Sequence, residues 1–140
     1  MIVFVAVDET GGTMFNHRRQ SMDRALRREL LARTQGKPLW MSAYTRRQFR
    51  EEETAQFCVD EDCLTRAAAG EYCFAEGQPL AEHAAKIEQI CLFRWDKRYP
   101  KDQSLDLALQ APAWVKVETK EFAGSSHECI TLEVYDHVEM

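Results

Sequence analysis

The chain begins Met-Ile-Val-Phe-Val-Ala-Val at residues 1–7 and continues Asp-Glu-Thr-Gly-Gly at residues 8–12. A short run of β-branched and aromatic residues that stops at acidic residues and a glycine pair is typical of a buried strand. No basic segment precedes the run and no small-residue cleavage site follows it, so it does not resemble a signal peptide. The opening therefore predicts a first buried strand over Ile2 to Val7.

The segments after this strand alternate between helical and β-like patterns. Met22, Leu26 and Leu30 recur at helical spacing, which predicts a helix over about 22–34 with Ser21 as its N-cap. A loop is expected over 13–20, irregular chain over 99–112, strands at 39–41, 56–59, 71–75, 87–95, 114–119 and 129–135, and short helical segments at 45–49, 62–69 and 79–85. This order predicts an α/β fold with a mainly parallel central sheet, helices on both faces and an antiparallel C-terminal strand.

Length and composition limit the class of protein. A chain of 140 residues has the length of one domain, so residues 1–140 are expected to form a single unit. No apolar run reaches the roughly 18 residues of a membrane span, so we expect a cytoplasmic protein that does not contact membranes. A net charge of −5 argues against general affinity for nucleic acid. Residues 17–50 nevertheless carry ten Lys or Arg against two acids, which indicates either the solvated face of a helix or a site for a phosphate, nucleotide or acidic partner.

The cysteines and histidines do not form a metal-binding or hydrolytic motif. Cys58 and Cys63 are the one close pair among five cysteines, and no second Cys or His pair lies near enough in sequence to complete a zinc site. We therefore expect no metal, and we expect Cys73, Cys91 and Cys129 to be core residues. Ser126 and His127 are adjacent, and neighbours on extended chain point to opposite sides, which argues against a nucleophilic pair.

Several short motifs follow one another along the chain. They are Val3 to Asp8 followed by Gly12-Thr13-Met14 and Phe15-Asn16, then Pro38 to Thr45, Ile90 to Asp96, and Ser125-Ser126-His127 before Ile130 to Tyr135. This succession resembles dihydrofolate reductase over nearly the whole chain. The resemblance implies NADPH as the cofactor. It also implies that Asp23 is the carboxylate that contacts a pterin ring, and that Thr45 lies at a helix start that holds cofactor phosphate.

The resemblance and the basic stretch together define the candidate site residues. They are Asp23 as the catalytic residue, Thr45, Arg46, Arg47, Glu76 and Gly77 as cofactor-binding residues, and Phe15, Asn16, Arg18 and Arg19 as substrate-binding residues. Each type of residue also has a purely structural interpretation. An acid near a helix start stabilises the macrodipole, a threonine there caps the helix, and surface arginines solubilise the chain.

Two departures from the family pattern bear on function. Ala75 and Glu76 precede Gly77 where the family has paired glycines, and a carboxylate there opposes an anionic cofactor. The segment from Asn16 to Asp23 is longer than in the family and more basic.

Three hypotheses follow from the sequence. The preferred one is a dihydrofolate reductase-like protein, non-standard or non-catalytic, that binds a nucleotide or another small anion. The alternative is an NADPH-dependent reductase of a dihydropterin-like heterocycle anchored by Asp23. A third is a homodimer whose aromatic strands, with Trp95 and Trp114, form the interface.

Overall fold

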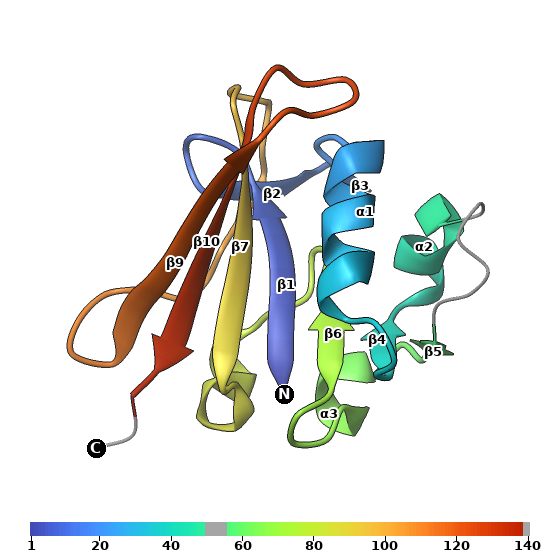
Figure 1. The fold of residues 1–140 in the computed structure, drawn as a ribbon, viewed down its shortest axis with the longest axis vertical. Helices are drawn as coiled ribbons and strands as arrows, with labels where there is room; N and C mark the ends of the chain where they lie inside the picture. Colours follow the sequence, from blue (N-terminus) through green and yellow to red (C-terminus); the bar gives the residue numbers. More distant parts are fainter. Residues whose placement is uncertain (50–55, 139–140) are drawn as a thin grey trace.

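A central sheet organises the structure, a computed structural model that describes residues 1–49 and 56–138 (Figure 1). The strand order is β5-β4-β6-β1-β7-β10-β9. The strands are β1 (Ile2–Val7), β4 (Leu39–Met41), β5 (Phe57–Val59), β6 (Tyr72–Phe74), β7 (Gln89–Trp95), β9 (Trp114–Phe122) and β10 (Ile130–His137). The five strands from β5 to β7 pair in parallel, whereas β10 is antiparallel to both β7 and β9. The predicted α/β class, mainly parallel with an antiparallel end, is confirmed.

A smaller sheet corrects the prediction of an unstructured loop over 13–20. It has the order β3-β2-β8, from β3 (Arg18–Arg19), β2 (Gly12–Phe15) and β8 (Gln103–Ser104). Asn16 and His17 connect β2 to β3 with φ values of 52° and 61°. Positive φ at both central residues is the geometry of a type I′ hairpin turn, which asparagine tolerates well. The irregular chain expected over 99–112 likewise contains β8.

The helical segments lie close to their predicted positions, but two caps differ. They are α1 (Arg24–Arg33), α2 (Ala43–Arg46), α3 (Cys63–Arg66) and two 3₁₀ segments, η1 (Arg47–Phe49) and η2 (Ala81–Lys86). Asp23 caps α1, not Ser21, because the Asp23 carboxylate accepts the Ala25 N–H at 2.8 Å. Ser42 caps α2, with its hydroxyl accepting the Thr45 N–H at 3.2 Å, so Thr45 lies inside the helix and is not its cap.

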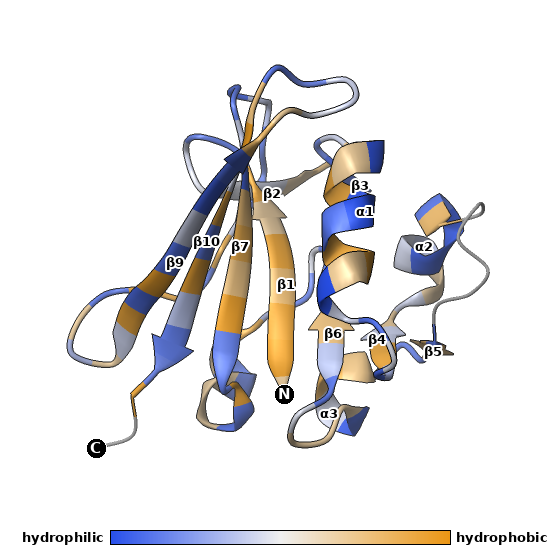
Figure 2. Cartoon of the chain, viewed as in Figure 1, coloured by the Kyte–Doolittle hydropathy of each residue, from blue (hydrophilic) through white to orange (hydrophobic). Residues whose placement is uncertain are grey.

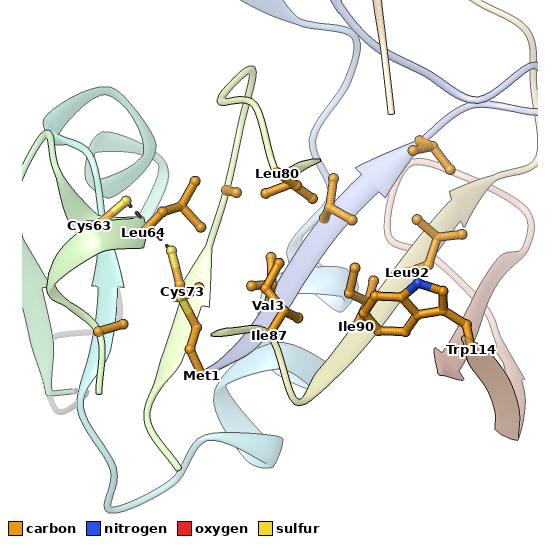
Figure 3. Packing of buried hydrophobic residues seen from close by; sticks show 14 residues of the cluster. Met1, Val3, Cys63, Leu64, Cys73, Leu80, Ile87, Ile90, Leu92 and Trp114 are labelled. Carbon is orange, nitrogen blue, oxygen red and sulfur yellow. Dashed lines mark hydrogen bonds between the residues drawn. The ribbon is translucent and has the colours of Figure 1, made fainter. Parts of the chain in front are cut away.

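Two apolar clusters cover opposite faces of the sheet. On one face Leu26 and Leu30 of α1 pack with Phe4 and Phe93. On the other face Cys63 and Leu64 of α3, Cys73, Ile90 and Trp114 share a cluster with Val3 (Figure 3). Figure 2 shows that β1 and β7 are hydrophobic along most of their length, while the edge strand β9 carries mostly hydrophilic residues. Burial on both faces explains why the parallel strands are nearly continuous apolar runs.

The cysteines and tryptophans test two further expectations. Cys73 and Cys91 are buried as expected of core residues, but Cys129 is only half-buried. Trp95 and Trp114 are 3% and 5% exposed within this single chain. Their burial in the chain's own core means that they do not present an aromatic surface to a second copy. No helix in the described ranges is both long and apolar enough to cross a bilayer.

Candidate functional site

The four predicted substrate-binding residues lie in one pocket, here called the hairpin pocket. It has a volume of about 250 Å³ and is lined by Phe15, Asn16, Arg18, Arg19, Gln20, Tyr99 and Pro100. The β2–β3 hairpin brings them together, because Phe15 pairs directly with Arg18 and Met14 with Arg19. Residues directly opposite in an antiparallel pair project from the same face, so Phe15 and Arg18 lie side by side. The sequence predicted these residues in a loop. In the structure the turn at Asn16 and His17 pairs β2 with β3 and so brings the residues together on one side of the hairpin.

Glu76 lies beside α2, and its carboxylate is fully engaged. Arg19 donates to it from Nε and from one terminal nitrogen at 2.9 and 3.0 Å, which is a bidentate ion pair. The Thr45 hydroxyl donates at 2.9 Å and the Gln48 amide at 3.2 Å. The Glu76 side chain is only 7% exposed. Arg19, Thr45, Gln48 and Glu76 are here called the α2 corner, in which a buried carboxylate is neutralised by an arginine.

The other predicted cofactor-binding residues do not join the α2 corner. The Arg46 guanidinium stacks 4.2 Å above the Phe57 ring and donates to the Phe49 carbonyl at 3.2 Å. Arg47 is exposed. Gly77, with φ of 73°, lines a separate pocket of about 340 Å³ together with Thr13, Gln78 and Gln103 from nearby loops and strands.

Asp23 is held by the loop between β9 and β10, which Figure 1 shows reaching over the start of α1. Besides capping α1, its carboxylate accepts the Ser125 and Ser126 backbone N–H groups at 2.9 and 2.8 Å. Gly124 makes this approach feasible, because a Cβ there would lie 2.8 Å from a carboxylate oxygen of Asp23 and 2.6 Å from the His127 carbonyl oxygen. Asp23 is 2% exposed. The role predicted for it beside a heterocycle stays a prediction.

Hydrogen bonds keep Asp23 ionised. Burial by itself raises the pKa of this carboxyl, but hydrogen bonds from the Ser125 backbone and the His127 side chain outweigh burial and lower the pKa well below its usual range. The carboxylate is therefore ionised at neutral pH.

His127 links Asp23 to two hydroxyl groups. Its Nδ1 lies 2.9 Å from the Asp23 carboxylate, and its Nε2 lies 3.0 Å from both the Ser21 Oγ and the Tyr99 hydroxyl. Trp95 stacks on the imidazole with ring centroids 4.4 Å apart. Ser21, Asp23, Tyr99 and His127 are here called the histidine cluster. Sequence reasoning weighed only the neighbouring Ser126 as a partner, because nothing in the sequence brings residue 21 next to residue 127.

Metal binding finds no support in these arrangements. Within the described part of the chain, no group of three or more His, Cys, Asp or Glu side chains is placed to hold a metal ion.

Comparison with known proteins gives a fold relationship. No protein-family model and no curated protein matches the sequence. Among solved structures, the chain is similar to dihydrofolate reductase from Enterococcus faecalis complexed with NADP(H) and RAB-propyl. The TM-score is 0.67 at 11% sequence identity, over 99% of this chain and 96% of that chain. The chain has a dihydrofolate reductase-like fold. At this level of identity the likeness concerns the fold alone.

Proposed function

We propose that this dihydrofolate reductase-like protein does not catalyse a reductase reaction and serves as a binding protein. Its ligand is a nucleotide or another small anion, which it binds in the hairpin pocket. The observation that carries the proposal is the position of the Glu76 carboxylate, which takes up the hydrogen-bond donors of the α2 corner. Arg18 remains exposed in the hairpin pocket, whereas Arg19 is paired with Glu76.

The α2 corner does not fit the phosphate groups of NADPH. The resemblance to the reductase family assigns cofactor phosphate to the helix start near Thr45. In this chain the Thr45 hydroxyl and the Arg19 guanidinium both donate to Glu76. A phosphate at this position would have to displace a carboxylate held by three side chains, or lie beside it at the cost of repulsion between like charges.

The hairpin pocket offers the groups that a small nucleotide requires. Phe15 is 47% exposed and gives a flat apolar surface for a base. Arg18, directly opposite on the hairpin, offers a planar guanidinium that matches phosphate geometry. The amides of Asn16 and Gln20 line the same pocket. Because a volume of about 250 Å³ lies below the range typical of drug-sized ligands, the pocket suits part of a mononucleotide, with the remainder outside it.

The alternative function is an NADPH-dependent reductase of a dihydropterin-like heterocycle, with Asp23 as the polar anchor. It is favoured by the fold likeness to a reductase whose structure contains NADP(H). It requires Asp23 to exchange hydrogen bonds from two backbone N–H groups of the β9–β10 loop for bonds to a ligand. Such an exchange gives up two charge-assisted hydrogen bonds to the buried Asp23 carboxylate, which costs about 1 kcal/mol or more for each.

Titration with AMP and with NADPH, followed by tryptophan fluorescence and by the thermal midpoint, tests the proposal. We expect AMP to bind saturably and Arg18→Ala to weaken binding about tenfold, while the exposed Arg28 on α1 serves as the matched control in an Arg28→Ala variant. NADPH is expected to bind no more tightly than AMP to the wild-type protein, and Glu76→Gln is expected to improve NADPH binding. Tight NADPH binding together with dihydrofolate-dependent oxidation that disappears in Asp23→Asn would instead establish the reductase.

A further inference from the structure

The histidine cluster has the connectivity of a nucleophile, a base and an orienting acid. The Ser21 Oγ lies 3.0 Å from His127 Nε2, and His127 Nδ1 lies 2.9 Å from the Asp23 carboxylate. Both distances fall in the hydrogen-bond range that links the members of serine-based catalytic sites. His127 and Asp23 are 7% and 2% exposed, and Ser21 is half-buried at the start of the segment that leads into α1.

The tautomer of His127 follows from its partners. Because the Asp23 carboxylate is ionised and carries no proton, it accepts the Nδ1–H of the ring. A neutral imidazole then has its lone pair on Nε2, which faces the Ser21 hydroxyl. Trp95 stacked on the ring and the loop bonds to Asp23 fix this orientation. The base is therefore aligned to take the hydroxyl proton of Ser21.

Tyr99 supplies a second hydroxyl at the same nitrogen. Its oxygen lies 3.0 Å from Nε2, the same distance as that of Ser21. One lone pair accepts one hydrogen along its axis, so when Ser21 donates to Nε2 the hydrogen of Tyr99 is free for another acceptor. Tyr99 also lines the hairpin pocket. A tyrosine hydroxyl at this position is suited to stabilise the oxyanion that forms when a bound carbonyl is attacked.

We propose that Ser21, His127 and Asp23 form a catalytic relay that hydrolyses a small ester carrying an anionic group. This activity goes beyond the proposed binding role, and only the preference for an anion rests on the proposed use of the hairpin pocket. Tyr99, whose hydroxyl shares His127 Nε2 with the Ser21 Oγ, lines that pocket together with Arg18. An anion held by Arg18 thus occupies the pocket that borders the histidine cluster at Tyr99.

The reaction proceeds in two balanced steps. The Ser21 Oγ forms a bond to the carbonyl carbon while its proton moves to His127 Nε2, and the carbonyl π electrons go to the oxygen beside Tyr99. The oxyanion collapses, the bond to the leaving alkoxide breaks, and Nε2 returns the proton to that alkoxide. A water molecule then repeats the sequence on the acyl-serine, which releases the carboxylic acid and regenerates Ser21.

A fluorophosphonate probe and two para-nitrophenyl esters test the relay in the full chain. The probe reports the nucleophile, because the serine oxygen displaces fluoride and the phosphonyl mass stays on the labelled peptide. We expect labelling at Ser21, and we expect Ser21→Ala and His127→Asn each to lower para-nitrophenyl succinate hydrolysis by about 100-fold or more. Ser104, an exposed serine of β8 outside the histidine cluster, is the matched control, and Ser104→Ala keeps full activity. Ser21→Cys keeps a nucleophile and is expected to be alkylated by iodoacetamide at that position.

Each outcome decides a separate point. No probe adduct on folded wild-type protein, or an adduct at another serine, overturns the relay. Circular dichroism and the thermal midpoint establish that the variants are folded, and slower alkylation of Ser21→Cys when His127→Asn is added tests the base without loss of the nucleophile. If the succinate and acetate esters react equally and Arg18→Ala changes neither, the relay stands and the anion preference is wrong. That result also separates the relay from the proposed binding function, which the AMP titration tests independently.

Discussion

The α2 corner and the histidine cluster both place a buried acid beside the start of a helix, yet they leave different chemistry available. At the α2 corner the Glu76 carboxylate is paired with an arginine, a hydroxyl and an amide, so every charge is neutralised inside the protein. In the histidine cluster the Asp23 carboxylate is held mainly by backbone N–H groups and by one imidazole nitrogen. The other imidazole nitrogen still faces two hydroxyl groups.

The difference shows that the partner of an acid, rather than the acid itself, decides its role. A bidentate arginine satisfies a carboxylate and leaves neither group free to bind a ligand. A histidine passes the influence of the carboxylate to its second nitrogen, where it can act on a hydroxyl proton. The groups of the α2 corner are therefore not free to bind a ligand, whereas the histidine cluster keeps a nitrogen that can accept a hydroxyl proton.

The largest effect on stability is expected from Asp23→Ala. The variant leaves three backbone N–H groups and the His127 Nδ1–H without their acceptor, so we expect the free energy of unfolding to fall by about 3 to 5 kcal/mol. Urea denaturation measures it. Asp62→Ala is the matched control, because Asp62 caps α3 without a side-chain hydrogen bond, and its loss is expected to cost less than about 0.5 kcal/mol. Equal losses in the two variants would contradict the account of the histidine cluster.

A smaller loss is expected from Glu76→Ala at the α2 corner. Removal of the buried carboxylate takes away an acceptor that Arg19 and Thr45 share, but Arg19 still donates to the Tyr44 carbonyl and its side chain is 18% exposed to water. We therefore expect a loss of about 2 to 3 kcal/mol in urea denaturation. A double-mutant cycle with Arg19→Ala should give a coupling of about 1 to 3 kcal/mol. A cycle without coupling would mean that Glu76 and Arg19 do not stabilise each other, so that the α2 corner is free to bind a ligand.

A third buried acid, Asp8, accepts hydrogen bonds from the turn before β2, and its contribution to stability is expected to depend on pH in acid. Burial by itself raises the pKa of Asp8, but hydrogen bonds from the Tyr99 and Gly12 backbone outweigh it and lower the pKa from 3.8 to about 2. The folded pKa is depressed, so this stabilisation is fully present above pH 3.8 and is lost as the pH falls through about 2. The shift corresponds to about 2 kcal/mol. In Asp8→Asn this part of the pH dependence should be absent. If the urea midpoints of the variant and of the wild-type protein fall equally over this pH range, the stabilisation does not come from Asp8.

The smallest effects are expected at Arg46 and Arg47, the predicted cofactor residues that lie outside the α2 corner. Arg46→Ala removes the stacking on Phe57 and is expected to lower the free energy of unfolding by about 0.5 to 1 kcal/mol. Arg47 is exposed, so Arg47→Ala is expected to change it by less than about 0.5 kcal/mol. Neither variant should alter NADPH binding. A loss of NADPH binding in either variant would support the cofactor-binding role that the sequence predicted for that residue.

The local pattern of the sequence was sufficient for the sheet and the main helix. The apolar run of β1, the spacing of Leu26 and Leu30 and the alternation of strands with helices predicted the α/β fold that the structure has. The pattern was misleading over 13–20, since the turn residues Asn16 and His17 form a hairpin whose signal is weaker than that of Asn-Gly.

The sequence by itself determined which residues are apolar, which are acidic and in what order the strands and helices occur, because these properties depend on near neighbours in the chain. Only the tertiary structure decided that Glu76 meets Arg19, and that His127 meets Ser21 and Asp23. The physical reason is that side chains 57 to 106 positions apart are brought together by strand order and loop closure. No local preference encodes such contacts.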